Sequence, residues 1–214
     1  MTLPADLFPS DEFDDWAETY DNSVAINQFP FYGYVSVLDA LAAAAELRTG
    51  LTVLDLGTGT GNLAERFARA GCELWCLDFS AAMLEKALVK LPAARFCLHD
   101  LRKPWPQQLE DLTFDRIVSA YVFHHFQLDE KIRILKDLCT RLSPGGRILI
   151  ADIAFPDAFT RDAMKTSLGQ DWEDEFYWLA DETLATLQQA GLQASYRQVS
   201  DCAGVFIIQG ASAF

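Results

Sequence analysis

The segment at residues 53–71, VLDLGTGTGNLAERFARAG, holds three glycines in five residues between an apolar run and a helical pattern. The run at 52–56 is typical of a buried strand, and apolar residues keep helical spacing over 62–70 until Gly71 ends the helix. Such a strand–glycine–helix turn lets a ligand come close to the backbone. A tight turn without a ligand is the alternative interpretation.

Strand-like and helical segments alternate along the rest of the chain. Further strands are expected at 73–78, 94–100, 114–120, 147–152, 193–200 and 204–211, with helices at 80–91, 129–142 and 182–190. This alternation predicts an α/β fold with a doubly wound, mostly parallel sheet. The last two strands are separated by too few residues for a crossover, so we expect them to pair antiparallel.

Length and composition favour one compact unit. A chain of 214 residues, of which 50% are hydrophobic, is long enough to bury a sizeable core. We therefore expect an N-terminal helical cap over residues 1–50 and a single ligand-binding domain over residues 51–214.

Charge and hydropathy argue against several classes of protein. The formal net charge is −14, which disfavours nucleic acid as a partner. No run approaches about 18 consecutive apolar residues, so we expect no membrane span. The acidic N-terminus lacks the pattern of a secretory signal, which favours a cytoplasmic location. The five cysteines are scattered without a CxxC pair, which indicates buried thiols and no metal site.

The glycine spacing separates two kinds of nucleoside ligand. Gly57, Gly59 and Gly61 form GxGxG, whereas the dinucleotide fingerprint is GxGxxG. Asp78 ends the second strand about 20 residues further on, where a carboxylate can bind ribose hydroxyls in either class. Asp55 discriminates better, because a carboxylate beside the loop suits a cationic amine and repels a pyrophosphate.

Five segments, in order along the chain, resemble the motifs of class I S-adenosylmethionine-dependent methyltransferases. They are VLDLGTGTGNLA (53–64), LDFSAAMLEKA (77–87), HDL (99–101), FDRIVSAYVFHHF (114–126) and LSPGGRILIAD (142–152). The resemblance implies that family's seven-stranded sheet and S-adenosylmethionine as the cofactor. The N-terminal FDDWAETYD (13–21) is similar to small bacterial methyltransferases of mostly unassigned substrate.

The resemblance also implies roles for individual residues. Gly57, Thr58 and Gly59 approach the methionine part of the cofactor. Asp78 binds the ribose hydroxyls, and Phe79 and Met83 pack against the adenine. Asp100 and Leu101 bind its amino group and cover the ring, and Ser119 faces the transferred methyl group. We add Asp55 and Asn62 to the candidate cofactor-binding residues.

The N-terminal aromatic residues suggest a cover over the cofactor. Trp16 and Tyr20 are four residues apart, so we expect them on one face of a short helix. Their faces would attract a sulfonium cation, with Tyr20 near the sulfonium or the carboxylate tail of the cofactor. The alternative is that these rings only pack on the core.

His124 and His125 are candidates for a catalytic role. Neighbouring histidines are expected to point in different directions, and only His99 remains elsewhere, so we expect no metal site. Histidine is common at this position in the resembling family, near the substrate pocket. We therefore select Tyr20, His124 and His125 as residues to test for general-base catalysis. A structural role for the histidines is the alternative.

The segment at 169–182, GQDWEDEFYWLADE, has two interpretations. Its acids and aromatics can form a wall of the substrate site that favours an amine or cationic acceptor. Alternatively it is an amphipathic helix with Trp172, Phe176 and Leu179 facing inward.

The sequence therefore predicts in-line methyl transfer to a small-molecule acceptor, in which orientation supplies much of the rate. An NAD(P)-dependent oxidoreductase and a non-catalytic module with the same fold are the alternatives.

Overall fold

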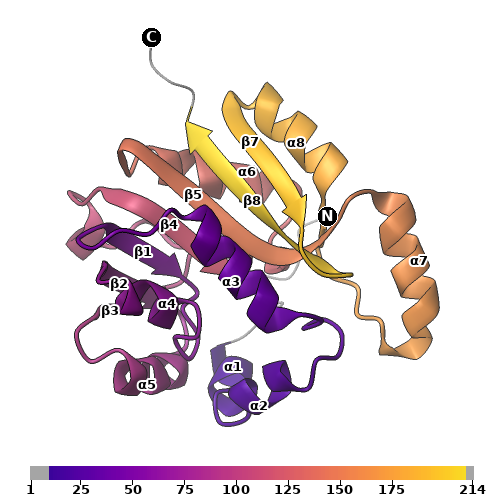
Figure 1. The fold of residues 1–214 in the computed structure, drawn as a ribbon, viewed down its shortest axis with the longest axis horizontal. Coiled ribbons are helices and arrows are strands. Elements are labelled where there is room, and N and C mark those ends of the chain that lie inside the picture. The colour runs from indigo at the N-terminus through magenta and orange to yellow at the C-terminus, as the bar shows by residue number, and fades with distance from the viewer. Residues whose placement is uncertain (1–9, 211–214) are drawn as a thin grey trace.

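A mixed sheet forms the centre of the protein, of which the computed structural model describes residues 10–210 (Figure 1). Its strands lie in the order β3-β2-β1-β4-β5-β8-β7. They are β1 (Thr52–Leu56), β2 (Glu73–Asp78), β3 (Arg95–Leu98), β4 (Phe114–Ala120), β5 (Leu142–Phe155), β7 (Leu192–Gln198) and β8 (Ala203–Gly210). The first five pair in parallel, and β8 is antiparallel to both β5 and β7. The predicted fold class is confirmed.

Helices cover both faces of the sheet. They are α1 (Ser10–Trp16), α2 (Tyr20–Ala25), α3 (Tyr34–Ala44), α4 (Ala64–Arg69), α5 (Ala81–Lys90), α6 (Leu128–Cys139), α7 (Ala158–Leu168) and α8 (Ala180–Gln189). Side chains alternate between faces along β1, because successive residues of a strand point to opposite sides. Val53 belongs to the buried cluster that includes residues of α3 and α4, whereas Leu54 and Leu56 belong to the second cluster, with residues of α6 and α8.

The N-terminal helices are fastened to the glycine loop and to α5, beside which α1 and α2 lie in Figure 1. The Ser80 hydroxyl donates to Asp14 Oδ1 over 2.5 Å. Asp21 accepts from the Thr60 hydroxyl over 2.6 Å and from Lys90 Nζ over 2.8 Å. These contacts hold α1 and α2 over the carboxyl ends of β1 and β2. Residues 1–9 of the expected cap and residues 211–214 lie outside the described residues.

The segment at 169–182 is not the amphipathic helix that its spacing allowed. A single 3₁₀ turn at Gly169–Asp171 follows α7, and the chain then runs extended into a two-residue strand, β6 (Trp178–Leu179), parallel to the end of β5. The pairing is possible because β5 is longer than predicted: it begins at Leu142 and continues to Phe155. The expected helix at 129–142 correspondingly ends at Cys139.

Within the described residues, no helix is long and apolar enough to cross a membrane. All five cysteines are free thiols, and Cys76, Cys97 and Cys202 are buried.

Candidate active site

A cavity of about 480 Å³ opens at the carboxyl ends of the parallel strands, between them and the N-terminal helices. It brings together most of the residues selected from the sequence. These are Trp16, Tyr20, Gly57, Gly59, Asp78, Phe79, Met83, Asp100, Leu101, His124 and His125. A much smaller cavity of about 20 Å³, lined in part by Asp55, Thr58 and Asn62, shares Tyr20, Gly57 and Gly59 with the main one.

The glycine loop presents its backbone to this cavity. Both Gly57 and Gly59 have positive φ, at +64° and +53°. A Cβ on Gly57 would lie 2.3 Å from Val122 Cγ2, so close packing requires glycine there. A Cβ on Gly59 would meet no atom within 4 Å, which leaves open space above this residue. Close packing therefore requires the first glycine, whereas the second has open space beside its backbone.

Two buried carboxylates flank the loop. Asp78 accepts from the Gly59 and Ser80 backbone N–H groups over 2.8 and 2.9 Å, and Asp55 accepts from the Thr58 hydroxyl over 2.5 Å. Burial raises the pKa of Asp55 to about 7 and the pKa of Asp78 to about 6, although these hydrogen bonds oppose the shifts. Asp55 Oδ1 has no hydrogen-bond partner among the described residues. A positive charge bound beside these groups would favour their ionised forms and lower both pKa values.

Two of the selected residues are already engaged by other groups. The Ser119 hydroxyl is fully buried and donates to the Leu56 carbonyl over 2.7 Å, so Ser119 lines neither cavity. Its expected position facing a ligand is wrong, because its side chain joins two neighbouring strands; the next residue, Ala120, lines both cavities. The Asn62 amide donates to Asp21 Oδ1 over 3.0 Å and helps to fasten α2.

The aromatic wall differs in construction from the prediction. Trp16 ends α1 and Tyr20 begins α2, so the two residues do not share one helix. A turn between the helices still brings their rings edge to face, with centroids 4.8 Å apart. Phe13, Phe31 and Tyr121 extend this wall of the cavity. Burial holds the pKa of Tyr20 well above its usual value, so its phenol is protonated at neutral pH and is not a base.

The two histidines lie on a 3₁₀ turn, Phe123–His125, directly after β4. His124 Nδ1 is 2.6 Å from Asp152 Oδ1, and Asp152 also accepts from the His124 backbone N–H and from Trp178 Nε1, both over 2.9 Å. Burial lowers the pKa of His124, but the charge and hydrogen bond of Asp152 outweigh it, and the pKa lies above its usual value. This network fixes the orientation of one imidazole.

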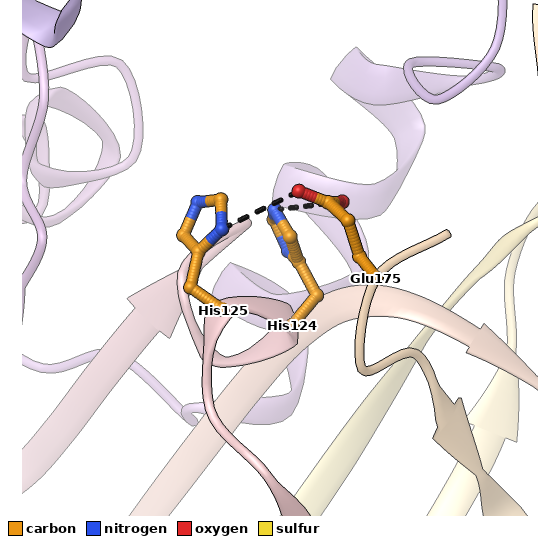
Figure 2. Close-up of side chains that lie close together, drawn as sticks. All are labelled: His124, His125 and Glu175. Atoms are coloured by element: carbon orange, nitrogen blue, oxygen red, sulfur yellow. Dashed lines mark ion pairs between the residues drawn. The ribbon is translucent and has the colours of Figure 1, made fainter. Parts of the chain in front are cut away.

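His125 and Glu175 complete this end of the cavity. Burial and the neighbouring His124 lower the pKa of His125 to about 4, so its ring is neutral at physiological pH. Figure 2 shows both rings directed toward the Glu175 carboxylate. The expectation that the neighbouring histidines diverge is wrong: their ring centroids are 4.1 Å apart.

Sequence reasoning missed Asp152 and did not single out Glu175. Asp152 is a lone charge within the apolar run 148–155, and such a charge in a buried strand is a signal for a polar network. Glu175 lies in the acidic segment that the sequence marked as a candidate wall, and Glu173 of the same segment also lines the cavity. The partners of Glu175, His124 and His125, lie far away along the chain, so sequence spacing alone does not identify this contact.

Comparison with known proteins agrees with this architecture. Residues 53–146 match a methyltransferase-domain family model. An uncharacterized methyltransferase of Geobacillus kaustophilus is 32% identical over 197 residues, which cover 88% of this chain and 90% of that protein. An uncharacterized methyltransferase of Alkaliphilus oremlandii is 32% identical over 206 residues, 94% of this chain and 88% of that protein.

The fold recurs in a solved complex of DhpI with SAM and HEP, at a TM-score of 0.73 and 21% identity, covering 97% of this chain and all of that one. By sequence similarity and by fold, the chain belongs to the class I S-adenosylmethionine-dependent methyltransferase family.

Proposed function

We propose that this protein transfers a methyl group from S-adenosylmethionine to a small-molecule acceptor bound in the 480 Å³ cavity. The observation that carries the proposal is that one cavity contains two groups of functional residues. One group comprises the glycine loop with Asp78 and Asp100, and the other comprises His124, His125 and Glu175. The volume is within the range of small-ligand sites, so an acceptor that shares it with a cofactor must be small.

The residues present fit the cofactor. Open space above Gly59 accommodates a ligand atom where a Cβ would lie. Asp78 is placed to accept from ribose hydroxyls, and Leu101, Phe79 and Met83 supply apolar surface for an adenine ring. Asp55 keeps one unpartnered buried oxygen beside the loop, which suits an ammonium group. The Asp55 carboxylate beside the loop would repel a pyrophosphate, which argues against the oxidoreductase alternative.

The catalytic contribution of the chain is positioning. S-adenosylmethionine supplies an electrophilic methyl group on a sulfonium. Aromatic residues of α1 and α2 line the cavity, and their faces favour positive charge by about 0.5–2 kcal/mol. Tyr20 can donate a hydrogen bond through its protonated phenol. His124, oriented by Asp152, can accept a proton from an acceptor that must lose one.

The acceptor class follows from charge. Glu173 and Glu175 line the side of the cavity away from Asp78, and the lowered pKa of Glu175 keeps it ionised: the histidines outweigh the opposing effect of burial. Together with a net charge of −14, these acids favour an amine or another cationic small molecule and disfavour nucleic acid. Family membership leaves a non-catalytic binding protein as the alternative function.

Calorimetric titration with S-adenosylmethionine, S-adenosylhomocysteine and NAD tests the cofactor. We expect binding of the two sulfur nucleosides alone, and weaker binding of both by Asp78→Ala. Turnover is then followed as S-adenosylhomocysteine formation with a panel of small amines. A protein that binds the cofactor but releases no S-adenosylhomocysteine with any member of a broad acceptor panel would favour the non-catalytic alternative.

A further inference from the structure

The side chains of His124, His125 and Glu175 converge on one point at the edge of the cavity (Figure 2). Glu175 Oε2 is 3.7 Å from His124 Nε2, and Oε1 is 3.5 Å from His125 Nδ1. The three ligand atoms all lie within 4.8 Å of one another. Two imidazole nitrogens and a carboxylate oxygen are thus close enough together to be ligands of one ion.

We propose that these three side chains bind one divalent transition-metal ion, such as Zn²⁺ or Co²⁺. Two ligand atoms on a tetrahedral Zn²⁺ are about 3.3 Å apart, given metal–ligand bonds of about 2.0–2.1 Å. The distances from Glu175 to the two ring nitrogens exceed this value by only a few tenths of an ångström. Each pair of ligand atoms is therefore at most about 1.5 Å farther apart than on a bound tetrahedral Zn²⁺.

The surroundings of His124 provide independent support. Histidines that ligate metals usually donate the other ring N–H to a carboxylate, which fixes the tautomer and the ring. Asp152 does this at His124 Nδ1, and Trp178 and the His124 backbone hold Asp152 in turn. The lone pair of Nε2 is thereby directed toward Glu175. A histidine with only a packing role does not need its outer nitrogen directed at a second carboxylate.

The ligand set specifies the class of ion. Imidazole nitrogen favours zinc, cobalt, nickel, copper and iron, whereas Mg²⁺ prefers oxygen ligands. Three protein ligands leave coordination positions open, as in metal sites that also bind water or a ligand. Here the three ligands line the cavity, so an oxygen or nitrogen donor in the cavity could complete the coordination. A bound ion would use the Nε2 lone pair of His124, so His124 can act as a proton acceptor only in the metal-free protein. Among residues 10–210, this is the one group of three or more potential ligand side chains that lie close enough together.

The histidine content of the chain gives a sharp test. Metal-free, untagged full-length protein is titrated with Zn²⁺ by calorimetry and with Co²⁺ by visible absorption. We expect one ion per chain and ligand-field bands for bound Co²⁺. His125→Ala and Glu175→Gln should each weaken binding by about tenfold or more. His99→Ala is the matched control. His99 is the one remaining histidine of the sequence; it lines the same cavity and lies outside the cluster. Its metal affinity should equal that of the wild type.

Three results would overturn the proposal. The first is the lack of stoichiometric Zn²⁺ binding by the wild type, and the second is equal Zn²⁺ affinity in the wild type, His125→Ala and Glu175→Gln. Equal binding of Mg²⁺ would likewise show that surface acids, and not the imidazoles, hold the ion. Circular dichroism confirms that each variant is folded, and the Co²⁺ spectrum of the wild type requires no variant. The metal titration needs no cofactor, so its outcome is independent of the proposed methyl transfer.

Discussion

The glycine loop offers a paired experiment, because Gly57 and Gly59 have similar backbone angles and different surroundings. In Gly59→Ala the left-handed conformation costs about 1–2 kcal/mol, and the new methyl group meets no atom within 4 Å. We expect the melting temperature of the ligand-free protein to fall by about 2–8 °C. In Gly57→Ala the same backbone cost is joined by a 2.3 Å approach to Val122 Cγ2. Overpacking of this kind adds roughly 1–3 kcal/mol.

The two variants should separate stability from binding. Gly59→Ala places a methyl group in the space assigned to the cofactor, so we expect affinity for S-adenosylhomocysteine to fall by about tenfold or more, equivalent to about 1.4 kcal/mol. Thermal unfolding without ligand and calorimetric titration with ligand measure the two effects on the same preparations. Gly57→Ala should be the less stable of the pair.

Two outcomes would refute this reasoning. Wild-type affinity in Gly59→Ala would show that the open space above the loop does not hold the cofactor. Equal loss of stability in both variants would show that the Val122 contact does not distinguish the two positions. Circular dichroism at a temperature below both transitions ensures that affinity is compared between folded proteins.

Three further predictions concern acids around the same loop. Asp55→Asn should stabilise the ligand-free protein at pH 8 by roughly 2–4 kcal/mol while weakening cofactor binding, because burial raises the folded pKa to about 7. The contribution of the wild-type carboxyl to the free energy of unfolding is fully present below the pKa of the unfolded state and is lost as pH rises through about 7. In thermal unfolding, Asp55→Asn should therefore be stabilised relative to the wild type by less at pH 5 than at pH 8. The affinity for S-adenosylhomocysteine should fall as pH drops through about 6, where Asp78 takes up a proton, and titrations of Asp78→Asn should lack this step. Asp21→Ala removes the acceptor of Thr60 and Lys90, so hydrogen exchange in α2 should accelerate and cofactor release should quicken, with little change in melting temperature; unchanged exchange would contradict the fastening of α2 to the loop.

Local patterns predicted the half of the site that lies next to strand ends. The run 52–56 and the glycines after it were identified from sequence because strand, turn and helix follow one another directly, and Asp78 was found for the same reason. The other half depends on contacts between distant segments: Asp152 meets a histidine 28 residues earlier in the chain. The convergence of His124 and His125 depends on a 3₁₀ turn after Tyr121, whose φ is +57°. No residue of helix α7 is fully buried, so the sequence has no apolar stripe from which this helix could be predicted.

The network around the loop links cofactor binding to the order of the N-terminal helices. Asp78 holds the loop through the Gly59 N–H, and Asp21 holds it from the opposite side through the Thr60 hydroxyl on the next residue. A ligand that binds with the loop in this conformation therefore also favours the conformation in which α2 is fastened. Binding linkage is reciprocal. If the cofactor stabilises the ordered conformation of α2 by a given free energy, then a change that loosens α2 must weaken cofactor binding by that same free energy. We therefore expect the aromatic wall and the glycine loop to take part in one binding equilibrium, although only the loop directly follows a strand of the sheet.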